Sequence, residues 1–225
     1  MNIDISTKSF LSTLVIFSCL ITSTIYAEEV ELCEPFEGTQ VDSHHLSSML
    51  QAAEDGYLYR IKPESSVMKF CVNSSIGRIQ ARFKSFNGGL AITQIDNKSP
   101  AMVIIDVDSL ESDSILIESM LKSESFFDSE QYPDILFVSS GIVWINKVKG
   151  VIKGELTLHG VTKTIAFYVD FKKTQSDSGS DTISIVATTT IKRSEFGMST
   201  LSPIVDDQVN LCMLIDAYRH LPEVI

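Results

Sequence analysis

The sequence of 225 residues has few basic side chains and few histidines. It holds 18 lysine and arginine residues against 29 aspartate and glutamate residues, which gives a formal net charge of -11, and it contains four histidines. A surface this acidic repels phosphate backbones and anionic lipid headgroups, so binding to either through bulk charge is disfavoured. The shortage of histidine also limits general acid–base chemistry. We therefore expect no nucleic-acid partner.

The motifs of common enzymes are missing as well. The sequence contains no Gly-x-Ser-x-Gly nucleophile elbow, no Walker-type loop and no dinucleotide-binding fingerprint. Its aspartate pairs, Asp106 with Asp108 and Asp206 with Asp207, stand at strand boundaries, where aspartate is common in turns. The adjacent His44 and His45 point about 100° apart on a helix, so they do not easily face one metal ion. We expect no enzyme activity, no catalytic or metal-binding residues and no required cofactor.

Long hydrophobic runs are absent after residue 27, so we expect no stable membrane span in the rest of the chain. The apolar run Phe10–Ile21 follows Lys8 and leads through small and polar residues to Ala27, where acidic residues begin. This pattern is typical of a secretory signal peptide, and we expect cleavage near Ala27 and a periplasmic or secreted protein. An uncleaved anchor and lipid attachment at Cys19 are the alternatives.

Short β-branched and aromatic runs fill the chain from Tyr57 onward, separated by clusters of Gly, Pro, Asn, Asp and Ser. Alternating apolar and polar residues within these runs predict roughly eight strands, each buried on one face. The exception lies near Glu111–Phe127, where we expect Ile115–Ile117 and Met120–Leu121 to form a helix outside the sheet. Strands in this number most simply close into an all-β antiparallel barrel, because closure removes exposed sheet edges. A two-sheet sandwich would show the same alternation.

These patterns divide the chain into four parts. Residues 1–27 are the predicted signal peptide, and residues 28–56 form an N-terminal extension. The extension carries a short helix in which Leu46, Met49, Leu50 and Ala53 recur at helical spacing, with His44 and His45 interpreted as solvated. The predicted barrel covers residues 57–219, and residues 220–225 form a C-terminal tail.

Three segments resemble the YceI-like family of lipid- or polyisoprenoid-binding proteins. They are the strand and turn at Gly154–Lys163, the helix and strand at Leu110–Phe137, and the strand and turn at Ile191–Met198. The resemblance runs in order from Tyr57 to about Arg219. It implies a lipocalin-like barrel with an elongated apolar cavity, export, no catalytic hallmark, and a bound isoprenoid lipid or isoprenoid quinone.

The sequence departs from the family pattern in two places. Many members carry a histidine soon after the first strand, where this chain has Asn73-Ser74-Ser75. Many also carry Arg-Asp and a histidine before the Phe-Phe segment, where this chain has Ile117–Leu121. Both departures remove polar or basic groups that could meet a ligand headgroup, so a neutral headgroup such as a quinone ring fits this chain better than a diphosphate does. We interpret His159 as a solvated turn residue.

The strand alternation predicts which residues line the barrel interior. We expect Phe126 and Phe127 to cover one mouth of the barrel, with Phe196 and Met198 on a neighbouring loop; ordinary core packing is the alternative. The hypothesis is an exported protein that holds one lipophilic molecule, and the alternative is a filled barrel that acts in envelope stress or partner binding. A homodimer is left open. The predicted inward residues are Met68, Phe70, Val72, Phe137, Leu156, Leu158, Phe167, Val169, Ile185, Leu211 and Met213.

Three cysteines follow the predicted signal peptide, and their spacing matches no zinc motif. An oxidising compartment favours one disulfide among them. Cys71 and Cys212 both alternate against inward residues, so both face outward, and closure of the barrel makes their strands neighbours. We predict a Cys71–Cys212 bridge across this seam; the alternatives are a bridge from Cys33 to either thiol, or no bridge.

Overall fold

The computed structural model describes residues 42–92, 99–175 and 181–221. The predicted signal peptide and the Cys33 alternatives lie outside these residues. Within the described residues, no helix is both long and apolar enough to cross a bilayer.

The helix α1 (Ser43–Glu54) precedes the barrel. It begins at Asp42, whose carboxylate accepts a hydrogen bond from the backbone N–H of His44 at 3.1 Å. The buried face is formed by His45, Met49 and Ala52, which recur at helical spacing, and the helix contacts strands β1 and β4. The solvated interpretation of His45 is therefore wrong, because this histidine shares a helix face with the residues that pack inward.

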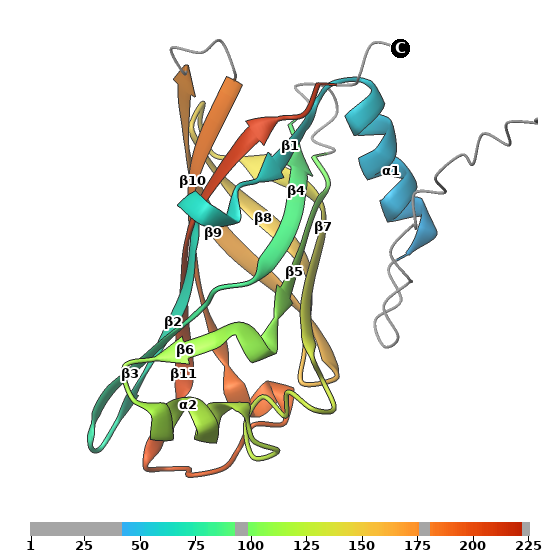
Figure 1. Ribbon diagram of the computed structural model, residues 1–225. Helices are drawn as coiled ribbons and strands as arrows, with labels where there is room; N and C mark the ends of the chain where they lie inside the picture. Colours follow the sequence, from blue (N-terminus) through green and yellow to red (C-terminus); the bar gives the residue numbers. More distant parts are fainter. Residues whose placement is uncertain (1–41, 93–98, 176–180, 222–225) are drawn as a thin grey trace, which may run out of the picture. The chain divides into compact units, whose positions relative to one another are not determined.

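The described strands form one closed antiparallel barrel (Figure 1). The hydrogen-bonded order is β1-β4-β5-β7-β8-β9-β10-β11, and β1 closes the ring by pairing with β11, with Ile61 opposite Ala217. The predicted barrel is confirmed, and the sandwich is not formed. The strands are β1 (Leu58–Ile61), β2 (Val67–Ser74), β3 (Gly77–Phe83), β4 (Phe86–Ala91), β5 (Ala101–Asp106), β6 (Leu110–Ser112), β7 (Asp134–Trp144), β8 (Lys149–Leu158), β9 (Val161–Gln175), β10 (Asp181–Lys192) and β11 (Val205–Arg219).

Three of the eight barrel strands are interrupted. A 3₁₀ turn at Pro63–Ser65 separates β1 from β2, and another at Val107–Ser109 separates β5 from β6. A break at residues 84–85 separates β3 from β4. As a result, the C-terminal end of β11 pairs with β1, and the rest of β11 pairs with β2. The strands β2, β3 and β6 continue the barrel wall toward the end that carries α2.

The helix α2 (Ile115–Lys122) connects β6 to β7 outside the sheet, as predicted. It begins at Ser114, whose hydroxyl accepts from the backbone N–H of Ile117. Among the described strands, β6 pairs with β3 and with no other, so α2 and the residues after it lie where the wall would otherwise continue from β6 to β7. Leu121, Phe126 and Phe127 are buried there.

The hydrophobic core inside the barrel consists of two clusters of buried side chains. The cluster at the α2 end includes Phe70, Phe83 and Phe127, and the cluster toward the other end includes Ile142, Phe167 and Ile183. Four half-buried side chains pack against both clusters and connect them: Ile105, Phe137, Ile165 and Leu211.

The seam between β2 and β11 corrects the disulfide prediction. The two strands are neighbours, but Cys71 lies opposite Asn210 and Cys212 lies opposite Lys69. Both thiols are free and half-buried on the outer face. The cysteines are thus diagonal neighbours, whose Cα atoms are usually about 7–8 Å apart, beyond the usual 4.4–6.8 Å for a disulfide. The predicted pairing is wrong because alternation sets the face of each thiol but not the register between strands.

Candidate ligand-binding cavity

An apolar cavity occupies the interior of the barrel. The cavity has a volume of about 170 Å³, counted as the space that the centre of a water-sized sphere can occupy. A single water needs roughly 10–15 Å³ on the same measure, so the cavity is much larger than a water-sized gap. Inward side chains of the barrel strands and of the α2 segment surround it, and nearly all of them are aliphatic or aromatic. The interior is therefore not the filled core of the alternative hypothesis.

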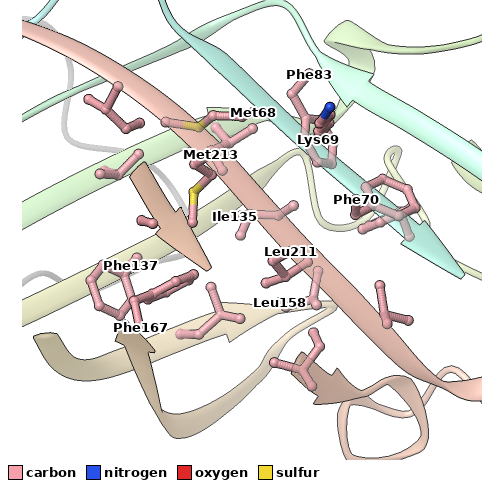
Figure 2. Close-up of a pocket in the computed structure, with 18 of the residues that line it drawn as sticks. Met68, Lys69, Phe70, Phe83, Ile135, Phe137, Leu158, Phe167, Leu211 and Met213 are labelled. Carbon is pink, nitrogen blue, oxygen red and sulfur yellow. The ribbon is translucent and has the colours of Figure 1, made fainter. Parts of the chain in front are cut away.

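Strand register explains how the cavity wall forms. Met68 on β2 lies opposite Met213 on β11, which lies opposite Ala187 on β10, which lies opposite Val169 on β9. Residues paired in this way share one face of the sheet, so this row projects inward as a unit. Figure 2 shows Met68 and Met213 in the same part of the cavity. Ala187 interrupts this row of larger side chains, and its small size leaves space for a ligand.

A glycine in the segment Gly154–Lys163 places one of the aromatic rings. A Cβ atom on Gly154 would lie 2.7 Å from the ring of Phe137 and 2.4 Å from the carbonyl oxygen of Val138. Only glycine therefore allows the Phe137 ring to lie against β8. The ring then packs edge-on against Phe167, with centroids 5.1 Å apart (Figure 2).

The α2 end of the cavity is covered by an aromatic cluster. The ring of Phe127 lies 5.6 Å from that of Phe70 and 5.8 Å from that of Phe83. The backbone N–H of Phe127 donates to the carbonyl of Leu121 at 2.9 Å, which fixes the turn after α2. Phe126 and Phe127 both line the cavity. The expected position over one mouth is thus found, while a role in ligand release stays a prediction.

The structure brings together the predicted ligand-binding residues with one exception. Phe196 is fully buried but does not line the cavity. It lies in the 3₁₀ turn Arg193–Phe196 after β10, where the alternation of the strand no longer sets the direction of side chains. The residues that do line the cavity are Met68, Phe70, Val72, Phe126, Phe127, Phe137, Leu156, Leu158, Phe167, Val169, Ile185, Leu211 and Met213. Their contact with a ligand stays a prediction.

Sequence reasoning missed many further lining residues. Most are alternate members of strands, so the same period of two would have found them. Met120 and Leu121 come instead from α2, and Lys69 and Arg193 are charged residues that the alternation did not select. Met198, which we expected on the loop beside the mouth, also lines the cavity. Besides these, the missed residues are Ile61, Ile79, Phe83, Gly89, Leu90, Ala101, Val103, Ile105, Ile135, Ile152, Ala187, Ile191, Val205, Val209 and Ile215.

Arg193 is a buried cation at the α2 end of the cavity. Its Nε donates to the carbonyl of Asp206 at 2.9 Å, and its Nη2 donates to the carbonyl of Val205 at 2.9 Å. Its Nη1 donates to the carbonyls of Thr200 and Met198. All three guanidinium nitrogens are therefore engaged by the backbone, and the residue fastens the loop before β11 to the end of β10.

The neighbouring turn is fastened by a carboxylate. Asp207 accepts hydrogen bonds from the backbone N–H of Ser194 at 2.8 Å and from its hydroxyl at 2.7 Å. These bonds, together with the positive charges of Arg193 and Lys192, hold the pKa of the Asp207 carboxyl below its usual value.

His159 is half-buried, so its interpretation as a solvated residue is wrong. Its Nδ1 lies 3.0 Å from the carbonyl oxygen of Phe196, and its ring lies 4.9 Å from that of Tyr132. The following Gly160 has a φ of 70°, and a Cβ there would lie 2.6 Å from the Tyr132 ring. The His-Gly turn therefore connects the β8–β9 hairpin to the 3₁₀ turn after β10, which is a structural role.

An acidic pair lies where the wall meets the segment after α2. Asp106 at the end of β5 lies directly opposite Asp134 at the start of β7. Burial raises the pKa of the Asp134 carboxyl, and the negative charge of Asp106 raises it further. Among the described residues, no three His, Cys, Asp or Glu side chains gather as a metal site.

Comparison with known proteins identifies relatives of the barrel. A family model described as YceI-like domain matches residues 59–217. A UPF0312 protein of Vibrio parahaemolyticus is 28% identical over 137 residues, covering 59% of this chain and 72% of the relative. A UPF0312 protein of Pseudomonas putida is 32% identical over 125 residues, covering 53% of this chain and 64% of the relative. The match thus spans less than two thirds of the Pseudomonas relative.

Solved structures share the fold. BcnA of Burkholderia cenocepacia matches with a TM-score of 0.62 at 23% identity, covering 69% of this chain and 98% of that one. A polyisoprenoid binding domain from Saccharophagus degradans matches with a TM-score of 0.56 at 14% identity, covering 72% and 98%. At these identities the likeness shows a common barrel architecture.

Proposed function

Because the chain belongs to the YceI-like domain family, we propose that it is a binding protein that holds one elongated lipophilic molecule inside its barrel. The observation that carries this proposal is the apolar cavity of about 170 Å³ that the barrel strands and the α2 segment line. The polyisoprenoid binding domain from Saccharophagus degradans, which shares the fold, supports an isoprenoid-type ligand.

The binding energy would come from apolar surface that leaves water. Each CH₂ group that becomes buried contributes about 0.8 kcal/mol. Two isoprene units, with about ten carbons, would therefore contribute about 8 kcal/mol before the costs of association. A prenyl chain does not need a charged contact to bind a cavity lined in this way.

A neutral headgroup, such as a quinone ring, fits the described cations better than a diphosphate does. Of the two described cations that line the cavity, Lys69 is exposed to solvent, and Arg193 is buried with its guanidinium nitrogens already donating to backbone carbonyls. Asn73 and Ile117–Leu121 stand where many family members carry histidine or arginine. A buried diphosphate needs paired cations to offset its loss of hydration.

We also propose that the protein is exported and acts by binding rather than by catalysis. The basic residue, apolar run and small residues before Glu28 support export. An exported carrier would move a lipophilic molecule through an aqueous compartment that otherwise excludes it.

The test is a cavity-filling variant with a matched control on the same strand. Ala187 lines the cavity and Thr188 is exposed on the outer face, so Ala187→Phe fills the cavity and Thr188→Phe does not. We expect Ala187→Phe to weaken binding of a fluorescent apolar probe by at least tenfold, while Thr188→Phe leaves binding unchanged. Mass spectrometry of an organic extract of the purified protein should show an isoprenoid lipid. Equal probe binding by wild type and Ala187→Phe would contradict the proposal.

A further inference from the structure

Several large apolar side chains are exposed at the α2 end of the barrel. Ile76 is 85% exposed in the β2–β3 turn, and Ile115 and Leu116 are 87% and 80% exposed on α2. Ile204 and Leu201, in the loop before β11, are 51% and 40% exposed. We call these five residues the apolar rim. Exposed apolar groups gathered in one region mark an interaction site more often than single scattered ones do.

Strand pairing places the three segments of the apolar rim at one end of the barrel. The backbone N–H of Ser75, next to Ile76, donates to the carbonyl of Ile204 at 2.9 Å. The strand β6 runs antiparallel to β3 from Leu110, opposite Phe83, to Ser112, opposite Ala81. It therefore runs toward the β2–β3 turn, and α2 begins three residues after it ends. Figure 1 shows α2, this turn and the start of β11 at the same end.

The apolar rim is continuous with the cover of the cavity. The helix α2 exposes Ile115 and Leu116, while Met120 and Leu121 on the same helix line the cavity. The turn after α2 carries Phe126 and Phe127, which also line it. A ligand that leaves through this end would pass directly from one apolar surface to another.

The charges near the apolar rim do not favour an anionic surface. On α2, Lys122 pairs with Glu118 at 3.1 Å, so its charge is neutralised locally. Asp113 and Glu124 flank the helix and are exposed, and together they outnumber Arg78, the exposed cation two residues after Ile76, whose guanidinium donates to the Cys71 thiol. Any membrane contact would therefore have to rest on apolar insertion and not on attraction to acidic headgroups.

We propose that the apolar rim docks on an electroneutral lipid bilayer and presents the α2 end of the cavity to the membrane for ligand exchange. This inference rests on the proposed function, because a bilayer is where a lipophilic ligand is obtained and released. The apolar rim consists of three separate projecting segments. A bilayer can accept all three, because each side chain inserts independently into the headgroup region and no complementary protein surface is needed. The small apolar area makes the docking weak and reversible.

Vesicle flotation tests the docking with the purified protein and phosphatidylcholine vesicles. The triple variant Ile76→Ser, Ile115→Ser and Leu116→Ser should co-float at least tenfold less than wild type. The control is Val143→Ser with Ile145→Ser, which changes side chains that are 60% and 62% exposed; Val143 lies at the end of β7 opposite α2, and Ile145 directly follows that strand. The control should float like wild type. Added anionic phosphatidylglycerol should not strengthen binding, and added salt should not weaken it.

Two further readouts separate this inference from the proposed function. Since no residue changed in the triple variant lines the cavity, it should bind the apolar probe in solution as wild type does, but transfer the probe to vesicles at least tenfold more slowly. Probe binding without flotation of the wild type would overturn the docking and leave the proposed function standing. Failure of the wild type to bind the probe would overturn the proposed function. Flotation of the wild type but not of the triple variant would still support the docking. A rim-dependent dimer in gel filtration without flotation would identify a second copy as the occupant and overturn the docking.

Discussion

Arg193 illustrates how one side chain supports the end of the barrel. It is 4% exposed, and its donors reach carbonyls on both sides of the loop that precedes β11. Buried carbonyl groups that lose such a donor cannot regain water without opening the loop. The residue thus fixes the chain that closes this end of the cavity.

Replacing Arg193 by methionine should lower the free energy of unfolding by about 2–4 kcal/mol, because several buried acceptors lose a charged donor. Urea titration followed by circular dichroism measures this change. Lys192→Met is the control, since Lys192 is exposed and its ion pair with Glu195 is long at 3.9 Å; it should change stability by less than about 0.5 kcal/mol. Equal midpoints for both variants would contradict the assigned role.

Asp134 should make stability depend on pH. The pKa of the Asp134 carboxyl is raised in the folded protein. Its contribution to the free energy of unfolding is therefore fully present below the carboxyl pKa of the unfolded chain, and it is lost as the pH rises through the pKa of the folded protein. Asp134→Asn removes this loss, and the variant should be more stable than wild type at pH 7. Urea midpoints should converge as the pH is lowered below the usual range of aspartate.

The control for Asp134 is Asp108→Asn, which removes an exposed carboxylate from the adjacent 3₁₀ turn. Its urea midpoint should follow that of wild type at every pH. A stability gain of Asp134→Asn that persists unchanged at acidic pH would show that burial of the charge is not the cause.

At the scale of elements, α2 and the turn after it replace barrel wall with side-chain packing. The pairing of β6 with β3 ends at Ser112, and the next strand in the chain, β7, begins at Asp134. The segment between them contributes Met120, Leu121, Phe126 and Phe127 to the cavity. Such a segment opens at a lower cost than paired strands, because few backbone hydrogen bonds hold it to the sheet.

Phe127→Leu should speed release of a bound apolar probe at least fivefold, because the aromatic contacts with Phe70 and Phe83 that cover the cavity are lost. Phe196→Leu is the matched control. Phe196 is also buried in the cluster at the α2 end but does not line the cavity. Both variants should lose about 1–2 kcal/mol of stability, but release should change only in Phe127→Leu. Stopped-flow displacement that gives equal rates for the two variants would favour ordinary core packing.

At the scale of the whole molecule, the barrel isolates an apolar interior from a polar exterior. The inward faces of the strands carry aliphatic and aromatic residues, whereas exposed positions on the strands carry polar or charged ones such as Gln80, Arg82 and Thr188. An interior of this kind is what the proposed binding of a lipophilic molecule requires.

Export should leave a shortened chain. Expression in a bacterial host followed by fractionation should place the protein in the periplasm or medium, with a mature N-terminus near Glu28 measured by mass spectrometry. Replacing Leu14 and Ile16 by aspartate should keep the precursor intact, because the apolar run is needed for recognition as a signal peptide. An intact N-terminus on exported wild-type protein would favour an uncleaved anchor instead, and a lipid-modified Cys19 would favour the lipid attachment.

The sequence by itself determined the local features of this protein. The period of two in each strand set which side chains face inward, and so the predicted wall residues from Met68 to Met213 line one cavity. The helix after Ser114 was also predictable, because its apolar residues and its cap lie within one short segment. These features depend on neighbours in the chain, which a sequence displays directly.

The tertiary structure alone decided what depends on distant segments. The register of β11 against β2 placed Cys71 opposite Asn210 and not opposite Cys212, because hydrogen bonding along the whole seam sets it. Phe196 does not line the cavity because it lies in a 3₁₀ turn, where the alternation of β10 has ended. Arg193 became buried only when the loop before β11 supplied its acceptors. The cavity gains space where the small Ala187 comes to lie between Met213 and Val169 in one inward row, and that row is set by strand register rather than by any single segment.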